Sequence, residues 1–157
     1  MKAIIGPYPD DDTKRVETVL LDPYDTWNMD HTLALLIVPM LKQLKATKHG
    51  APLVDDEYVP EHLRSTAAAP KENDWDVDDN HFKRWDYVLD EMIWAMEQIV
   101  DHDSDAKFYD HSEVNEEADI MEQVEQIKCD YPALDAHHKR IANGTKLFGI
   151  FFQSLWD

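Results

Sequence analysis

An apolar stripe between Asn80 and Val100 is the strongest constraint on how this chain can fold. Its members follow one another at helical spacing: Phe82, Trp85, Val88, Leu89, Met92, Met96 and Ile99. Such spacing gathers the side chains on one face of an α-helix. The opposite face is acidic, with Asp86, Asp90 and Glu97. Asn80 suits the N-cap position, so the pattern predicts an amphipathic helix that ends near Val100. Trp94 falls outside the stripe and indicates a second contact surface.

A second helix is expected from Thr26 or Trp27 to Lys48. Its core face would hold Leu33, Leu36, Ile37, Met40, Leu41 and Leu44. Leu35 and Val38 fall on the other side, so the first half of this helix is expected to be buried all round. Pro39 is expected to kink or split it, because proline lacks the backbone N–H that a helix interior needs.

A third helix is expected from Ala133 or Leu134 to about Leu155. Its predicted core face collects Leu134, Ile141, Phe148, Phe152 and Leu155. Gly144 carries no side chain and would allow a neighbouring helix to come close.

The segments between the helices are less regular. Alternation in residues 15–21 predicts a short strand. Residues 49–79 form a long connection with a turn of helix near 60–64. Residues 124–131 alternate like a strand, although 117–127 also fit a helix, and both interpretations stay open. We therefore expect one mainly α domain over residues 1–157, with three long helices packed as a small bundle, a short β element and long connecting loops.

The charge of the chain restricts its partners. There are 33 acidic and 15 basic side chains, a net charge of −18, with the acids concentrated in 72–79 and 101–125. Nucleic acids and anionic membranes bind through lysine and arginine, so neither is expected as a partner. A protein with a basic surface is expected instead, and the carboxylates would imitate the phosphates of a nucleic acid. The plainer interpretation is that the acidity only keeps the protein dissolved.

Cysteine content and apolar runs indicate the compartment. Cys129 is the single cysteine, so no disulfide framework is expected and a reducing cytoplasm is favoured. The longest apolar run, Leu33 to Leu41, is far shorter than the roughly 20 residues that span a bilayer.

Four side chains are candidate ligands for a divalent metal such as Zn, Mn or Mg. They are Asp30, His81, Glu91 and His137, which would converge if the three helices pack side by side. Imidazole and carboxylate groups supply the donors that such ions need. The spacing matches no established metal motif, and histidines held by ordinary hydrogen bonds are the alternative.

A second enzymatic hypothesis rests on acids alone. Asp86, Asp90, Glu91 and Glu97 resemble part of the acid set with which all-helical nucleotide pyrophosphohydrolases hold Mg²⁺. A solvated helix face is the simpler explanation for them.

A small basic patch is the candidate ligand-binding site. It comprises Lys42, Lys45, Lys48 and His49, and the aromatic residues Trp75, Trp85 and Tyr87 could lie beside it. Cations and aromatic rings together suit an anionic aromatic ligand such as a nucleotide. Lysines that merely cap the end of a helix are the alternative.

Several segments resemble a group of small proteins of unknown function from tailed phages, including marine and cyanobacterial phages. The matching segments are DPYDTWNMDHTLA (22–34), KQLKATKHGAP (42–52), DNHFKRWDYVLDEMIWAMEQ (79–98), DAHHKRIANGTKLFG (135–149) and SLWD (154–157). The resemblance implies expression in the cytoplasm of an infected bacterium, with host machinery or host defence as the target. It also implies that 101–131 varies and could form a hairpin.

The leading functional hypothesis is therefore a non-enzymatic phage binding protein. It would inhibit or sequester a host factor with a basic surface, or a small anionic signal molecule. The alternative is a metal-dependent hydrolase acting on nucleotides. Whether the chain forms a homo-oligomer, with Trp94 on the shared face, is left open.

Overall fold

The computed structural model describes residues 2–6, 14 and 17–156. Its long helices are α1 (Met29–Thr47), α2 (His81–Val100) and α4 (Tyr131–Ile150). A fourth, short helix, α3 (Ile120–Gln126), lies between α2 and α4 in the sequence. The prediction of a mainly helical fold is confirmed. The number of helices is wrong by one, because α3 forms where the sequence left helix and strand open. None of the helices in the described residues is long and apolar enough to cross a membrane.

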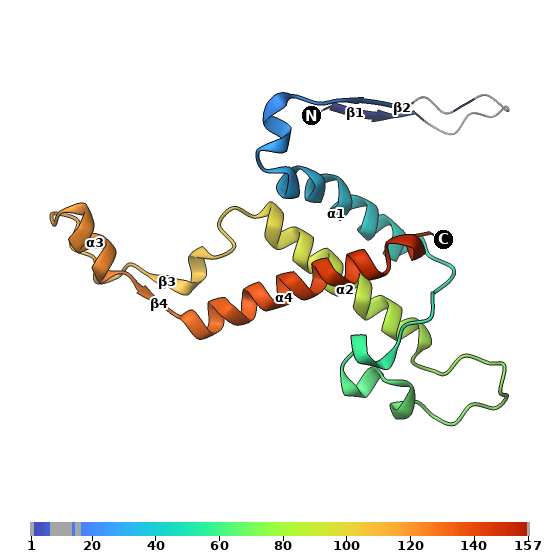
Figure 1. The fold of residues 1–157 in the computed structure, drawn as a ribbon. Coiled ribbons are helices and arrows are strands. Elements are labelled where there is room, and N and C mark those ends of the chain that lie inside the picture. The colour runs from blue at the N-terminus through green and yellow to red at the C-terminus, as the bar shows by residue number, and fades with distance from the viewer. Residues whose placement is uncertain (1, 7–13, 15–16, 157) are drawn as a thin grey trace.

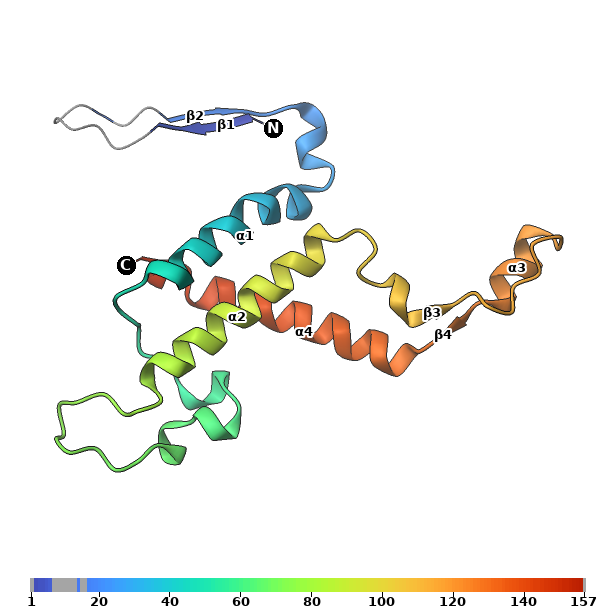
Figure 2. The ribbon, with the colours of Figure 1, turned by 180° about the vertical axis from the view of Figure 1, so that it is seen from behind.

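Helix α2 is the centre of the bundle. α1 and α4 each pack along α2 rather than along each other (Figures 1 and 2). The predicted stripe of α2 is mostly buried, and its fully buried members are Trp85, Val88, Leu89 and Met92. Phe82 is exposed at one end. The neighbouring elements complete the core with Leu41, Val54, Val59, Leu147 and Phe151.

Helix α1 is less buried than its sequence predicts. Only Ala34 and Leu41 are buried, and Leu33, Leu35 and Leu36 are exposed. The expectation that its first half is buried all round is therefore wrong, because α2 covers a single face. Pro39 lies inside α1 without splitting it.

Helix α4 presents a different face from the one predicted. Its buried residues are His137, Gly144 and Leu147, and Phe151 follows directly after the helix. Ile141 and Phe148 are only partly buried, and Phe152 is exposed. The close approach predicted at Gly144 is confirmed: a Cβ there would lie 2.4 Å from the backbone oxygen of Glu91.

Two small antiparallel hairpins complete the secondary structure. β1 (Lys2–Ile5) pairs with β2 (Glu17–Leu20), which corresponds to the predicted strand except that residues 15 and 16 lie outside the described residues. β3 (Tyr109–Asp110) pairs with β4 (Lys128–Cys129), and α3 lies between them. Both interpretations of this region are thus realised, a helix followed by a strand.

The long connection 49–79 is attached to the start of α2. It contains three short 3-10 turns, and the turn Glu61–Leu63 matches the predicted one. Asn80 occupies the N-cap position but makes no side-chain cap. Its amide group instead donates to the backbone oxygens of His62 and Arg64, at 3.4 and 3.3 Å. This contact ties the connection to the helix.

Candidate functional site

The three lysines of the predicted ligand site hold α1 against α2. Lys42 pairs with Glu97 at 2.6 Å, Lys48 pairs with Asp86 at 2.6 Å, and Lys45 pairs with Asp90. The polar face of α2, expected to be solvated, therefore faces cations of α1. The more exposed pairs, Lys42–Glu97 and Lys45–Asp90, contribute roughly 0.2–1 kcal/mol each. Their main effect is to fix the antiparallel register of the two helices.

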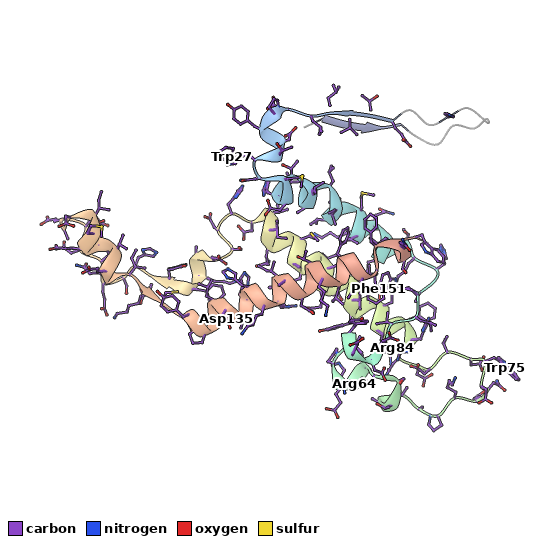
Figure 3. The ribbon with its side chains drawn as sticks, viewed as in Figure 1. Trp27, Arg64, Trp75, Arg84, Asp135 and Phe151 are labelled. Carbon is purple, nitrogen blue, oxygen red and sulfur yellow. The ribbon has the colours of Figure 1, made fainter. Side chains whose placement is uncertain are left out.

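The aromatic members of the predicted site do not gather around those lysines. Trp85 is buried in the core, and Tyr87 is half-buried, which raises the pKa of its phenol because burial disfavours the charged form. Trp75 is 84% exposed at the far end of the long connection (Figure 3). His49 is exposed after the end of α1. The structure does not assemble the predicted Lys/Trp pocket.

The predicted metal ligands are also dispersed. Asp30 is exposed at the start of α1. Nε2 of His81 lies 3.2 Å from the backbone oxygen of Ala51. His137 touches Trp94, which is thirteen residues beyond His81 and therefore about 20 Å along α2. Within residues 2–6, 14 and 17–156, no three His, Cys, Asp or Glu side chains are arranged to hold a metal ion.

Glu91, the fourth predicted ligand, forms an ion pair with α4. Arg140 donates to its carboxylate through Nε at 3.0 Å and through Nη2 at 2.7 Å. The guanidinium also stacks on Trp94, 3.9 Å from the ring centroid. The second contact surface predicted at Trp94 is therefore the contact with α4.

An acidic arm, residues 101–130, leaves the bundle between α2 and α4 and contains β3, α3 and β4 (Figure 1). It carries eleven acids and two lysines. At its tip α3 exposes three apolar side chains, Ile120, Met121 and Val124, beside glutamates. Asp119 caps α3 by accepting from the backbone N–H groups of Met121 and Glu122. The arm thus combines dense negative charge with a small apolar surface.

The arm is attached to α4 through Asp105. Nε2 of His138 lies 2.9 Å from Oδ2 of this carboxylate, and Nε2 of His137 lies 3.6 Å from Oδ1. The ring of His137 is buried between Trp94 and Phe108, with centroids 5.3 and 5.1 Å away. Burial lowers the pKa of His137, because the charged imidazolium loses its hydration there.

A second ion pair holds the long connection. Arg84 donates to both oxygens of Asp78, at 2.9 and 2.7 Å, and these bonds lower the pKa of Asp78 to about 2. Sequence reasoning missed this pair. The available signal was an arginine at the edge of the apolar stripe, next to Trp85 in the sequence, where a buried cation needs a partner.

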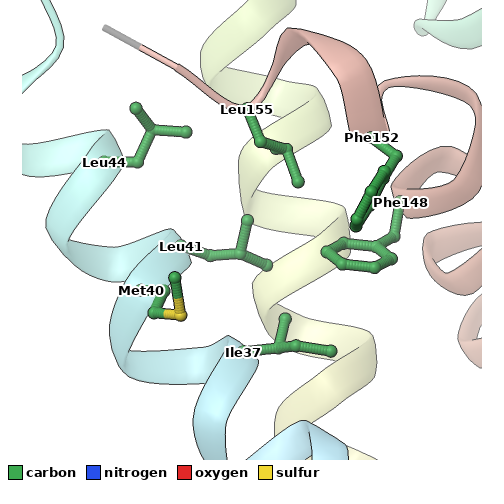
Figure 4. Close-up of a pocket in the computed structure, with 7 residues that line it drawn as sticks. All are labelled: Ile37, Met40, Leu41, Leu44, Phe148, Phe152 and Leu155. Carbon is green, nitrogen blue, oxygen red and sulfur yellow. The ribbon is translucent and has the colours of Figure 1, made fainter. Parts of the chain in front are cut away.

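An apolar groove lies between α1 and the C-terminal end of α4 (Figure 4). It has a volume of about 320 Å³ and is lined by Ile37, Met40, Leu41, Leu44, Phe148, Phe152 and Leu155. All seven side chains are apolar, so a ligand there would bind by burying apolar area. All seven residues were predicted to face the core, and the open groove explains why all of them except Leu41 keep some exposure.

Comparisons of the chain with protein-family models, curated proteins and solved structures found no match.

Proposed function

We propose that this chain is a non-enzymatic binding protein that covers a basic surface of a partner protein with its acidic arm. The observation that carries the proposal is the arm itself, with eleven acids and two lysines in 30 residues. Opposite charge accelerates encounter and selects for basic partners. In the setting implied by the resemblance to phage proteins, the partner is a host protein whose basic surface would otherwise bind nucleic acid.

The apolar tip of the arm supports recognition of a protein rather than of simple cations. Ile120 and Val124 are four residues apart and lie on the same face of α3, and both are exposed. Binding energy at interfaces is concentrated in a few buried apolar or aromatic anchors within a polar rim. Such anchors surrounded by glutamates fit a partner that is basic with an apolar centre.

The internal contacts of the arm reduce the cost of binding. The backbone N–H of Asp130 donates to the oxygen of Phe108 at 2.9 Å, and Lys128 pairs with Glu113 at 2.5 Å. Together with the Asp105–His138 contact, these interactions order the base of the arm before a partner arrives. A preordered surface loses less conformational entropy on association.

Binding of a small anionic molecule has less support. The ammonium groups of Lys42, Lys45 and Lys48 already face carboxylates of α2. An anion at this position would have to compete with Glu97, Asp90 and Asp86.

Titration with a synthetic helical peptide tests the proposal. The probe carries lysine on one face and leucine on the other, and a control peptide carries glutamate in place of lysine. We expect affinity for the lysine peptide only, falling at least tenfold between about 50 and 300 mM salt as charges are screened.

Two variants with equal net charge locate the binding surface. The triple substitution Glu116→Gln, Glu117→Gln, Glu122→Gln removes three charges from the arm. The control Glu61→Gln, Glu72→Gln, Asp79→Asn removes three exposed charges from the long connection. We expect the arm variant to bind the peptide at least fivefold more weakly than the control variant. Equal affinities for the two variants would show that net charge alone attracts the peptide, and the proposal would be wrong.

A further inference from the structure

Helix α1 has a second apolar face that nothing in the described residues covers. Its members are Met29, Leu33, Leu36 and Met40, which are 55%, 44%, 39% and 67% exposed. We call these four residues the outer stripe. Their spacing of four, three and four residues places them within an arc of about 60° on the helix. This is the spacing with which helices pair in coiled coils.

The groove continues the outer stripe. Met40 belongs to both, and Phe152 lines the groove while 62% exposed. Together the outer stripe and the groove carry apolar surface from the start of α1 to the C-terminal end of the bundle, and Figure 4 shows the groove. A continuous exposed apolar surface of this kind marks an interaction site in a folded protein.

The chain as a whole is less compact than a typical monomer of its mass. The chain exposes 11613 Å² at a mass of 18.3 kDa, whereas a compact monomer of that mass exposes about 8,100 Å². The difference is about 3,500 Å², and part of it comes from the acidic arm, which extends away from the bundle (Figure 1). A dimer that buries the outer stripe and the groove would remove part of this excess, and a standard interface takes about 800 Å² from each partner.

The charge distribution favours a second copy over a basic protein as the occupant of this face. Residues 29–48 carry one acid and three lysines, and residues 131–157 carry two acids and three bases. These two segments are therefore not acidic within a chain of net charge −18, although the three lysines pair with carboxylates of α2. A basic partner is attracted to the arm and not to this face. Two copies can meet here with their acidic segments outside the contact.

We propose that two copies of the chain form a dimer through the outer stripe of α1. A two-fold axis brings the same patch of each copy together, and an apolar stripe at coiled-coil spacing is complementary to itself. An antiparallel order places Leu33 of one α1 beside Leu36 of the other. The apolar residues of α1 that α2 leaves exposed would then be buried.

Analytical ultracentrifugation of the full chain tests the dimer. We expect a species of twice 18.3 kDa at micromolar concentration. The variant Leu36→Glu, Met40→Glu is expected to dissociate at least tenfold more readily, since four added charges would meet in the interface. The control Met121→Glu, Val124→Glu makes the same change at two exposed apolar residues of α3 and should remain dimeric. Circular dichroism verifies that both variants keep the helical content of the native chain.

Three results would overturn the dimer. They are a monomeric native chain at about 100 μM, a dimer that the α1 substitutions leave intact, and a dimer that the α3 substitutions dissociate. The peptide titration remains independent of this test, because the α1 variant retains the whole arm. Loss of the dimer with retained peptide binding confirms that the two surfaces are separate.

Discussion

Gly144 is the position at which the packing of α2 against α4 can be tested most directly. A Cβ at this position would lie 2.4 Å from the backbone oxygen of Glu91 and 2.5 Å from Cβ of Ala95. Backbone atoms cannot move aside as a flexible side chain can. The substitution Gly144→Ala therefore forces α4 away from α2, and the neighbouring contacts of Leu147 and Phe151 loosen with it.

The magnitude follows from two opposing effects. Alanine favours the helix over glycine by up to about 1 kcal/mol. Forcing an added carbon into a closely packed contact costs about 1–3 kcal/mol, and here the overlap involves backbone as well as a side chain. We expect a net loss of about 1–2 kcal/mol in the free energy of unfolding, which lowers Tm by about 2–8 °C in a chain of this size.

Gly149→Ala is the matched control in the same helix. Nothing lies within 4 Å of a Cβ at Gly149, so only the helix preference changes there. We expect this variant to be unchanged or up to about 1 kcal/mol more stable. Urea denaturation followed by circular dichroism measures both variants. If Gly144→Ala proves as stable as Gly149→Ala, α2 and α4 are not in close contact at this position and the packing described above is wrong.

Three further predictions concern charged groups. Asp78→Asn should lower the free energy of unfolding at pH 7 by about 2 kcal/mol. This is the stabilisation that corresponds to a fall of the Asp78 carboxyl pKa from 3.8 to about 2 on folding. This stabilisation is present above pH 4 and is lost as the pH falls toward 2, so urea midpoints of the native and variant chains should converge in that window; a constant difference would contradict the Asp78–Arg84 pair as its source. Burial lowers the pKa of His137, so the native chain should lose stability as the pH falls below about 6.5, the value of an unfolded histidine. The variant His137→Gln should lose less between pH 8 and pH 5.5, and an equal loss in both chains would exclude His137 as the cause. Lys42→Gln and Lys45→Gln should each cost less than about 1 kcal/mol in dilute buffer and almost nothing in about 1 M salt. A cost that persists in high salt would mean that these lysines stabilise α1 by packing rather than by charge.

The sequence predicted α2 well because the helix is amphipathic. Its buried stripe and acidic face differ clearly, so the spacing of Trp85, Leu89 and Met92 fixes both the type of element and its orientation. Its bounds also agree closely, from Asn80 to Val100. Helices with one apolar and one polar face are the most predictable elements of a chain.

The orientation of α1 and α4 could not be derived in the same way. Apolar residues surround α1, so the pattern does not indicate which side faces α2. In α4 the contact with α2 includes His137 and Gly144, which a hydrophobic pattern does not identify. Ile141 and Phe148 on the adjacent face are more hydrophobic, so the pattern selected that face instead.

The structure keeps the candidate ligand residues apart for a different reason. Lysines 42, 45 and 48 are clustered in the sequence, but their partners lie on another helix, 45 residues away for Lys45. The pattern of one segment cannot show that its charges are already neutralised by a distant one. The acidity of residues 101–125, in contrast, is a local property that the sequence shows directly. The proposed function rests on this acidity.

The central place of α2 has a consequence for how the molecule opens. Because α1 and α4 each dock on α2 and hardly on each other, either could detach while the other stays in place. Backbone amides of α2 would then be the last to exchange with deuterium, and those of α1 and α4 would exchange in separate units. The chain would behave as two helical hairpins, α1–α2 and α2–α4, that share α2, and each would open with its own free energy.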